Sequence, residues 1–109
     1  MGYRVGQGFD SHPLVDGRRL VLGGVQIAYP KGLQGHSDGD VVAHALANAI
    51  LGALGEGDLG RHFPDHDPRY AGADSIGLLN QVWKSAAWSS WNSRRAWKYR
   101  HHGGRFLRR

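Results

Sequence analysis

Residues 40–54, DVVAHALANAILGAL, are the stretch that decides the fold. Their apolar side chains recur with the 3.6-residue period of an amphipathic helix, at positions 42, 45, 46, 49, 50 and 53. Asp38 and Asp40 can cap and charge the first turn of this helix, and Gly55 can end it. The sequence therefore predicts a helix over residues 40–54, with His44 on its first turn and away from the strongest apolar stripe.

The segments before this helix predict short strands. Residues 3–9 alternate loosely between apolar and other side chains and contain two glycines, which indicates a strand whose backbone closely approaches another part of the chain. Residues 20–28, LVLGGVQIA, form two apolar runs around a glycine pair and predict two strands that are joined or bulged there. Residues 10–17 and 31–39 are expected to be loops.

The segments after the helix predict a loop and a second helix. Residues 58–72 are expected to form an ordered polar loop, and a loop of this length inside a compact domain usually has a function. Asp74 or Ser75 can cap a second helix whose apolar side carries positions 76, 78, 79 and 82. The helical pattern loses definition near Trp83, and a short helix over residues 86–91 is an open alternative.

Composition divides the chain into two parts. The 109 residues suit one small domain. The net charge is −3 over residues 1–83 but +8 over residues 84–109, and all four tryptophans lie at or after Trp83. We therefore expect a folded N-terminal portion, residues 1–82, followed by a basic Trp- and Arg-rich tail, residues 83–109, that is disordered.

Composition also excludes several classes of protein. The absence of cysteine excludes disulfide scaffolds and thiolate metal sites, so that any transition metal must be held by His, Asp or Glu. The longest apolar run is short, and the N-terminal residues lack the basic start, apolar stretch and cleavage site of a secretory signal. We expect a soluble, cytoplasmic protein.

Asp10, His12 and His44 are candidate metal ligands. Asp10 and His12 lie two residues apart at the end of a predicted strand, so that both side chains can leave on the same face, and His44 can close a three-ligand site. Three protein ligands leave a fourth position of a zinc ion open for substrate. Taken singly, the same residues are better explained as an Asx-turn former, a surface loop residue and a polar-face helix residue, and only their combination favours a metal site.

The sequence HSDGD, residues 36–40, lies directly before the predicted helix. Backbone amides at a helix start attract anions, and the side chains of His36 and Ser37 can hydrogen-bond phosphate oxygens or stabilise developing charge. On spacing alone, simple capping of the helix by Ser37, Asp38 and Asp40 is the favoured interpretation.

The predicted polar loop is rich in Asp and His. Carboxylates accept hydrogen bonds from sugar or polyol hydroxyls, and the glycine at position 60 lets the backbone come near a ligand. Capping of turns by the same side chains is the competing account. The residues concerned are Asp58, Asp65 and Asp67, with His62 and His66 beside them.

Several blocks of the sequence stand in the order and spacing of a known family. These blocks are GFDSH, LGGVQI, KGLQGHSDGDVVAHAL, GDLG, FPDHDP and GADS. Residues 1–82, which contain them, resemble the 2-C-methyl-D-erythritol 2,4-cyclodiphosphate synthase family. The resemblance implies an α+β fold with a mixed sheet and helices packed on one face, and a homotrimer whose active sites lie between subunits.

The resemblance also implies roles for individual residues. Asp10, His12 and His44 match the family's metal ligands, and His36 matches a catalytic position that stabilises the transition state. The stretches 58–60 and 63–67 match parts that hold the methylerythritol phosphate portion of the substrate. The implied substrate-binding residues are Asp10, His12, His36, Ser37, Asp58, Leu59, Gly60, Phe63, Pro64, Asp65, His66 and Asp67.

The function implied by the resemblance is that of a phosphorus–oxygen lyase in the non-mevalonate route to isoprenoid and terpenoid precursors. In the family reaction, the 2-phosphate of 4-diphosphocytidyl-2-C-methyl-D-erythritol 2-phosphate attacks the β-phosphorus, expels CMP and closes a cyclic diphosphate. Such a reaction needs in-line placement of the oxygens and neutralisation of phosphoryl charge. The resemblance implies that two metal ions neutralise this charge. One is a divalent ion, zinc or manganese, on the three ligands, and the other is magnesium on the diphosphate. No membrane or nucleic-acid partner is expected.

The tail departs from the family pattern. The family's further strands, cytidine pocket, Thr-Thr-Glu segment and trimer contacts do not appear after Val82, so the C-terminal part of the family fold is expected to be missing. Our hypothesis is that residues 83–109 are frameshifted, because a one-base loss from codons for Gln-Val-Val-Glu reads as Gln-Val-Trp-Lys, the sequence at residues 81–84. The alternatives are a catalytically inactive metal-binding fragment and a nucleic-acid-binding protein acting through the basic aromatic tail.

Overall fold

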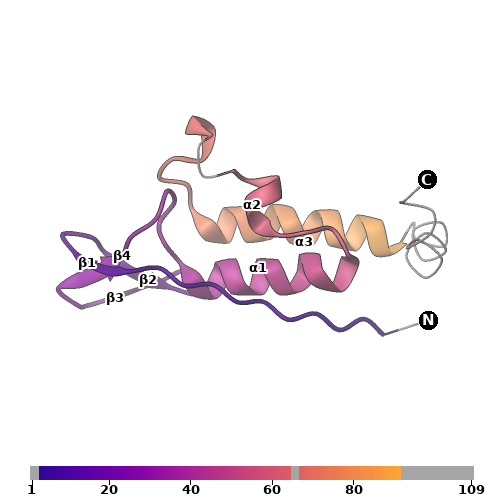
Figure 1. Cartoon of the computed structure of the whole chain (residues 1–109), viewed down its shortest axis with the longest axis horizontal. Coiled ribbons are helices and arrows are strands. Elements are labelled where there is room, and N and C mark those ends of the chain that lie inside the picture. The colour runs from indigo at the N-terminus through magenta and orange to yellow at the C-terminus, as the bar shows by residue number, and fades with distance from the viewer. Residues whose placement is uncertain (1–2, 65–66, 92–109) are drawn as a thin grey trace.

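The structure is a computed structural model and describes residues 3–64 and 67–91. Its elements are β1 (Leu14–Asp16), β2 (Leu20–Leu22), β3 (Val25–Ile27), β4 (Lys31–Leu33), α1 (Val41–Leu54), α2 (Leu59–His62), the 3₁₀ helix η1 (Pro68–Tyr70) and α3 (Ser75–Trp91). The strands gather at one end of the molecule, and α1 and α3 run side by side away from them (Figure 1). The described part is therefore a small α+β fold whose strands lie where the two long helices begin.

Helix α1 confirms the helix predicted over residues 40–54. Asp40 is its N-cap, and the Asp40 side chain accepts a hydrogen bond from the Ala43 amide. Gly55 ends the helix in the left-handed conformation, with φ of 68°. A residue with a Cβ is strained in that conformation, which explains the glycine at this position.

The face that α1 buries is not the predicted one. Val42 and Leu46 of the predicted apolar stripe remain 49% and 50% exposed. The prediction was wrong because α1 is apolar around most of its circumference, so that periodicity alone does not identify the side that meets the core. The residues that α1 buries are Ala43, His44, Ala47, Leu51 and Leu54.

His44 thus lies on the core-facing side of the helix and not on a polar face.

The two strands predicted around the glycine pair are confirmed as the hairpin β2–β3. The strands are antiparallel, with Leu22 opposite Val25. Gly23 and Gly24 form the connecting turn with φ values of 60° and 79°. Positive φ at both central positions is typical of the type I′ turn, whose twist matches that of the paired strands.

The strands β1 and β4 fall in segments that we expected to be loops. They pair antiparallel, with Val15 opposite Gly32. The loop prediction was wrong here because the strands have three residues each and β4 contains a lysine and a glycine, which are poor strand formers. Gly32 is required by packing, since a Cβ there would lie 2.2 Å from the Arg19 carbonyl oxygen.

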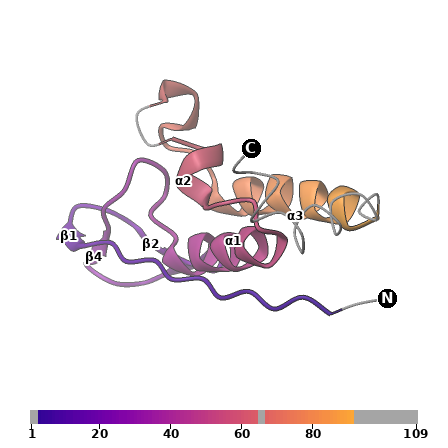
Figure 2. The ribbon, with the colours of Figure 1, turned by 45° about the vertical axis from the view of Figure 1, so that its right-hand side comes forward.

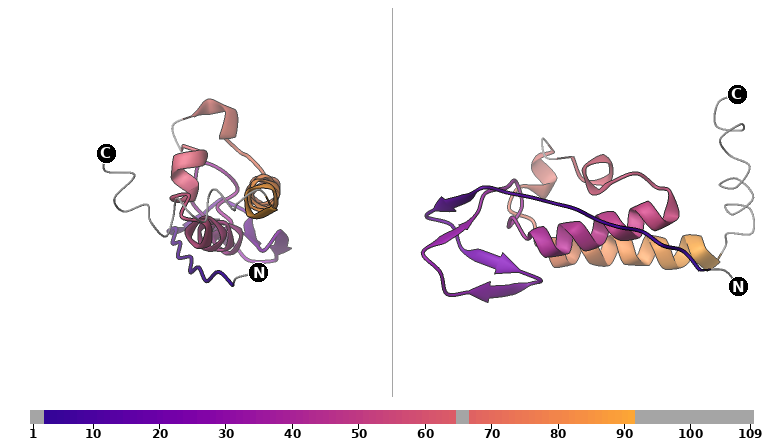
Figure 3. Two further views of the ribbon diagram at one scale, coloured as in Figure 1. Left: turned by 90° about the vertical axis from the view of Figure 1, so that its right-hand side faces the viewer. Right: turned by 60° about the horizontal axis from the view of Figure 1, so that its bottom comes forward.

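The sheet arrangement also differs from the expectation. The described ranges hold two separate two-stranded antiparallel sheets, and the expected mixed sheet with helices on one face is not found among them. Residues 3–9, predicted to be a strand, belong to neither of these sheets. They instead form an extended segment that runs along α1, as the right-hand view of Figure 3 shows.

Close backbone approach, predicted from the glycines of this extended segment, is present and is directed at α1. A Cβ on Gly6 would lie 2.0 Å from the Ala49 carbonyl oxygen, and a Cβ on Gly8 would lie 1.6 Å from the Ala45 carbonyl oxygen. No side chain fits at either position without moving the segment away from the helix. The glycines therefore fix the contact between the segment and α1.

The opposite side of the extended segment faces away from α1. Tyr3, Val5 and Phe9 are 102%, 92% and 82% exposed. Glycines toward the helix and large apolar side chains toward the outside follow the period-2 alternation of a β-strand. The prediction was thus right about the local pattern and wrong about pairing with another strand.

Replacing Gly8 by Ala should lower the free energy of unfolding by at least about 2 kcal/mol, because the added Cβ meets helix backbone that cannot give way. Gly52→Ala is the matched control, since Gly52 lies within α1 and the nearest atom to an added Cβ is 3.7 Å away. That control should raise stability by about 0.5–1 kcal/mol. Urea unfolding of the three chains measures both effects, and a Gly8→Ala chain as stable as the parent would contradict the packing of the segment on α1.

The connection between the long helices contains two short helical turns. Both α2 and η1 fall within residues 58–72, the segment predicted to be an ordered polar loop. Helix α2 lies against α1 (Figure 2). The connection returns the chain to the strand end of the molecule, so that α3 starts beside the first turn of α1.

Helix α3 begins as predicted and continues further than predicted. The Asp74 carboxylate caps it by accepting a hydrogen bond from the Ile76 amide at 3.1 Å. The helix passes Trp83 and reaches residue 91, so the expected loss of definition near Trp83 was wrong. Leu78, Val82 and Ala86 are 6%, 3% and 7% exposed, and their i, i+4 spacing carries a buried stripe across the compositional break. The tail from residue 92 onward lies outside the described residues.

The core lies between α1 and α3. Ala47 and Leu51 of α1 meet Val82 of α3, and partly buried apolar side chains surround them, namely Ile50, Leu59, Phe63 and Leu79. Among the described residues, no helix combines the length and the apolar character that crossing a membrane requires.

Candidate metal centre

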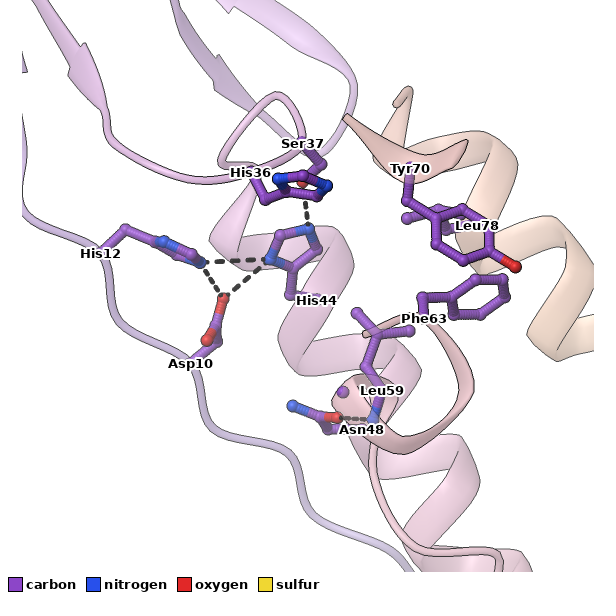
Figure 4. Close-up of a pocket in the computed structure, with 11 residues that line it drawn as sticks. Asp10, His12, His36, Ser37, His44, Asn48, Leu59, Phe63, Tyr70 and Leu78 are labelled. Carbon is purple, nitrogen blue, oxygen red and sulfur yellow. Dashed lines mark hydrogen bonds and ion pairs between the residues drawn. The ribbon is translucent and has the colours of Figure 1, made fainter. Parts of the chain in front are cut away.

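Asp10, His12 and His44 point toward one another (Figure 4). The first two follow the extended segment, and His44 lies on the first turn of α1. Asp10 Oδ2 is 2.9 Å from His12 Nε2 and 3.0 Å from His44 Nδ1, and the two nitrogens are 3.3 Å apart. The structure therefore brings together the three residues that the sequence singled out as candidate ligands.

The geometry of these three atoms fits a single divalent ion. Each residue offers one ligand atom, and the three atoms lie within 4.8 Å of one another. Tetrahedral coordination with bonds of about 2.0–2.1 Å places ligand atoms about 3.3 Å apart, close to the separations observed. Two imidazole nitrogens and a carboxylate, without sulfur, are donors that zinc, manganese and cobalt accept.

The candidate site is partly shielded from solvent. The side chains of Asp10, His12 and His44 are 23%, 22% and 11% exposed. Partial burial strengthens the attraction between a cation and the carboxylate, because less water screens it. The remaining exposure leaves one side of the site open to a small molecule.

The second nitrogen of His44 is also engaged. His44 Nε2 is 2.7 Å from the Ser75 hydroxyl oxygen and 3.2 Å from the Ser37 hydroxyl oxygen. Ser75 is the first residue of α3 and is only 1% exposed. The sequence indicated Ser75 only as a helix cap, since nothing local places it against His44.

Asp40 has the capping role that its spacing favoured. Its side chain is completely buried and accepts hydrogen bonds from the amides of Gly23, Gly24 and Ala43 at 2.9, 2.7 and 3.0 Å. One carboxylate thus caps α1 and anchors the β2–β3 turn. Asp40 is not among the residues that line the pocket described below.

Asp38 joins the loop before α1 to the start of α3. Its carboxylate accepts hydrogen bonds from the Ser75 hydroxyl, from the Ser75 amide at 3.0 Å and from the Asp40 amide at 3.1 Å. Partial burial of the carboxyl raises its pKa, but these hydrogen bonds outweigh the burial and hold the pKa of Asp38 below its usual value. The negatively charged form is therefore favoured.

A pocket of about 180 Å³ opens beside the three candidate ligands. Its lining combines polar groups near the ligands with apolar side chains from α2, η1 and α3, a composition typical of small-molecule sites. The lining residues are Asp10, His12, His36, Ser37, His44, Asn48, Leu59, Gly60, Phe63, Tyr70 and Leu78. Eight of these eleven are site residues predicted from the sequence, the exceptions being Asn48, Tyr70 and Leu78.

His36 is held at the wall of this pocket by two hydrogen bonds. Its Nε2 donates to the Asp67 carbonyl oxygen at 2.9 Å, and its own carbonyl oxygen accepts from the Gly72 amide at 2.8 Å. Both partners belong to the connection before α3. The predicted catalytic histidine thus has a defined position and lines the same pocket as Ser37 and His44 (Figure 4).

Other predicted site residues lie away from the pocket lining. Asp58 caps α2 by accepting a hydrogen bond from the Arg61 amide at 3.0 Å. Asp67 is paired with the exposed Arg69 guanidinium at 2.6 Å, and this hydrogen bond raises the pKa of Arg69 above its usual value. Pro64 is partly buried but is not among the lining residues. Asp65 and His66 lie outside the described residues.

Three lining residues were missed by the sequence interpretation. Asn48 lies one turn after His44 on α1, and this i, i+4 spacing is a signal that could have identified it. Its side chain accepts from the Leu59 amide at 2.7 Å and donates to the Phe9 carbonyl oxygen at 3.3 Å. Tyr70 packs edge-on against Phe63, with ring centroids 5.1 Å apart, and like Leu78 it had no local signal.

Comparison with known sequences identifies a family for most of the chain. The YgbB family profile matches residues 3–96, past the predicted boundary at Val82. A relative from Geobacillus kaustophilus named 2-C-methyl-D-erythritol 2,4-cyclodiphosphate synthase is 63% identical over 84 residues, which are 77% of this chain and 53% of that protein. The protein of the same name from Bacillus subtilis is 60% identical over 81 residues, which are 74% of this chain and 51% of that protein. The chain therefore spans about half the length of these curated relatives.

Comparison with solved structures points in the same direction. A structure of a 2C-methyl-D-erythritol-2,4-cyclodiphosphate synthase superposes with a TM-score of 0.74 and 45% identity, covering 80% of this chain and 58% of the other. A bifunctional protein from Campylobacter jejuni superposes with a TM-score of 0.72 and 48% identity, covering 77% of this chain and 23% of the other. From the extent of the family match and the identity to these relatives, we conclude that the chain belongs to the YgbB family.

Proposed function

We propose that this chain carries the metal-binding half of a 2-C-methyl-D-erythritol 2,4-cyclodiphosphate synthase. The observation that supports the proposal best is the convergence of Asp10, His12 and His44 at the edge of a pocket, in a chain 63% identical to a protein of that name. The reaction would be cyclisation of 4-diphosphocytidyl-2-C-methyl-D-erythritol 2-phosphate with release of CMP. This would be a lyase step in isoprenoid biosynthesis, with a cytoplasmic location.

The proposed metal ligands are Asp10, His12 and His44, and zinc or manganese suits their donor atoms. When bound there, the ion supplies neutralisation of the charge that spreads over phosphoryl oxygens during transfer. Magnesium is proposed as a second ion on the diphosphate. The three ligand atoms lie 2.9–3.3 Å from one another, separations that suit a single ion.

The chain's own polar groups are proposed to hold the phosphates beside that ion. His36 keeps its ring at the pocket wall through the hydrogen bond to Asp67, so that it can stabilise charge at a fixed position. Ser37 follows it and lines the same pocket. A group that is already oriented stabilises a transition state more than one that must be ordered during the reaction.

The apolar end of the pocket is proposed to receive the methylerythritol portion of the substrate. Leu59, Gly60 and Phe63 line this end, and Tyr70 supports Phe63 through the edge-on ring contact. These groups exclude water from the reacting phosphates and leave space for a branched polyol. The remaining proposed substrate-binding residues are Asp58, Pro64, Asp65, His66 and Asp67.

We propose that further functional parts belong to the half of the relatives' length that this chain does not match. The cytidine pocket, the contacts of a homotrimer and further strands are assigned to it. The frameshift hypothesis for residues 83–109 stays a prediction, and the nucleotide sequence downstream of codon 82 tests it. An intact family sequence in another reading frame is the expected finding.

The proposed function predicts that this chain alone releases CMP weakly or not at all, whereas a chimera is active. In the chimera, residues after Val82 are replaced by the corresponding part of the Geobacillus kaustophilus relative. CMP release from the cytidine diphosphate substrate is measured with zinc and magnesium and after chelation of both metals. The expected result is metal-dependent release by the chimera and its loss on His36→Ala. A folded chimera that binds zinc and releases no CMP would refute the proposed reaction.

A further inference from the structure

A chain of hydrogen bonds lies behind the candidate metal centre. His44 Nε2, the nitrogen directed away from Asp10 and His12, is 2.7 Å from the Ser75 hydroxyl oxygen. That hydroxyl also makes a hydrogen bond to Asp38. His44 and Ser75 are both buried, so water does not readily substitute for either contact.

The position of Asp38 is fixed independently of His44. Its two carboxylate oxygens accept from the amides of Ser75 and Asp40 at 3.0 and 3.1 Å. The Asp38 amide donates to the Ala73 carbonyl oxygen at 3.2 Å. These bonds tie the loop before α1 to the start of α3, so that the Ser75 hydroxyl meets a carboxylate that cannot turn away.

The chemistry of the three groups sets the direction of each hydrogen bond. An ionised carboxylate only accepts, so the single hydroxyl proton of Ser75 is donated to Asp38. In its contact with His44, the Ser75 oxygen can then only accept, which requires a proton on His44 Nε2. The second lone pair of the same oxygen can accept from the Ser37 hydroxyl, which is 3.3 Å away. The Ser37 hydroxyl, at 3.2 Å from His44 Nε2, makes a longer contact.

We propose that Ser75 and Asp38 are positioning residues for the metal centre, because the chain Asp38–Ser75–His44 keeps a proton on His44 Nε2 and presents Nδ1 to the metal. This inference rests on the metal site of the proposed function. It assigns to the GADS and HSDGD motifs a role beyond capping, namely orientation of one ligand ring from the opposite side. Residues that orient a ligand histidine in this manner typically change metal affinity by about 10–100-fold when they are replaced.

Ser75→Ala is the variant that breaks this chain of hydrogen bonds. It should weaken zinc binding by about 10–100-fold, measured by competition with a chromophoric chelator. Ser75→Thr retains the hydroxyl and should restore most of the affinity. Ser85→Ala is the matched control, because it removes a serine hydroxyl from an exposed position of the same helix, and it should leave zinc affinity unchanged.

A double-mutant cycle tests whether Ser75 and Asp38 act through one pathway. Asp38→Asn should also weaken zinc binding, and the double variant should bind no more weakly than Ser75→Ala alone. Additive losses would show that the two residues act separately and would overturn the proposed chain. Thermal unfolding of each metal-free variant identifies the folded fraction to which the affinities refer.

Nitrogen-15 NMR of the zinc-loaded parent chain tests the proton position directly. The expected spectrum has His44 Nδ1 bound to the ion and a slowly exchanging proton on His44 Nε2, which is lost in Ser75→Ala. Coordination through Nε2, or zinc affinity of Ser75→Ala within twofold of the parent, would overturn the inference. If the hydrogen-bond dependence holds but the chimera releases no CMP, the proposed reaction fails and the positioning role stands.

Discussion

Zinc binding should weaken by a factor of about 10²–10³ when His12 is replaced by Ala. A four-ligand zinc site is worth roughly 10–16 kcal/mol, or roughly 2.5–4 kcal/mol for each ligand. That share corresponds to a factor of about 10²–10³ in the dissociation constant. His12 contacts Asp10 and His44 through its ring and is partly exposed, so that its loss should affect the ion far more than the fold. Competition with a chromophoric chelator measures the affinity.

His62→Ala is the control for this experiment. His62 is exposed, lies outside the pocket that contains the candidate ligands, and donates its Nε2 proton to the Glu56 carbonyl oxygen at 2.8 Å. Its replacement removes one imidazole of the seven histidines without touching the candidate centre. Equal zinc affinity of His12→Ala and the parent would end the case for a three-ligand site, while equal losses in both variants would indicate nonspecific binding.

The second large effect is expected for stability, on replacement of Asp40 by Ala. This change removes the acceptor for three backbone amides, from Gly23, Gly24 and Ala43, in a completely buried position. Loss of an N-cap alone costs about 1 kcal/mol, and each buried donor left without an acceptor costs about 1–3 kcal/mol. The free energy of unfolding should therefore fall by at least about 3 kcal/mol, a large part of the total for a small domain.

Asp16→Ala is the matched control for Asp40→Ala. The Asp16 side chain is 87% exposed and lies 4.0 Å from the Lys31 ammonium, so its removal should change stability by less than about 0.5 kcal/mol. Asp40→Asn keeps the shape of the side chain and should give an intermediate loss. Urea unfolding followed by circular dichroism distinguishes the three variants, and equal stabilities of Asp40→Ala and Asp16→Ala would show that the cap and the turn do not depend on Asp40.

The part of the fold predicted from sequence is the part that depends on local chemistry. Helix α1 carries its own caps, Asp40 and Gly55, and the β2–β3 hairpin carries its own turn in Gly23 and Gly24. Each of these signals lies within a few residues of the element it defines. The continuation of α3 through Trp83 was not predicted because the tryptophans, serines and lysine after Val82 interrupt the apolar pattern, and Ala86 alone is a weak signal for the i, i+4 stripe.

The parts that were not predicted depend on distant partners. Strands β1 and β4 are stable as a pair, and nothing within Lys31–Leu33 marks that segment as a strand. The buried face of α1 is selected by α3 and by the extended segment, which the helix sequence does not encode. His44 could therefore be identified as a candidate ligand, while its burial and its contact with Ser75 could not.

The candidate centre was predictable because short spacing and a family pattern agreed. Asp10 and His12 share one local motif, and His44 lies at a defined place in the helix that follows HSDGD. The pocket wall was less predictable, since no local pattern marks Tyr70 or Leu78 as residues that line a pocket. Both residues reach the pocket through the path of the chain between α1 and α3, which local sequence patterns do not specify.

The extended segment couples the outer surface of the molecule to the candidate centre. Its last large side chain, Phe9, stands immediately before Asp10, and only one further residue separates Asp10 from His12. A second polypeptide strand that paired with residues 3–9 would restrict the motion of the backbone that supplies two of the three donor groups, Asp10 and His12. Tight metal retention and assembly with such a strand would then reinforce each other, without any contact between the added strand and the ion.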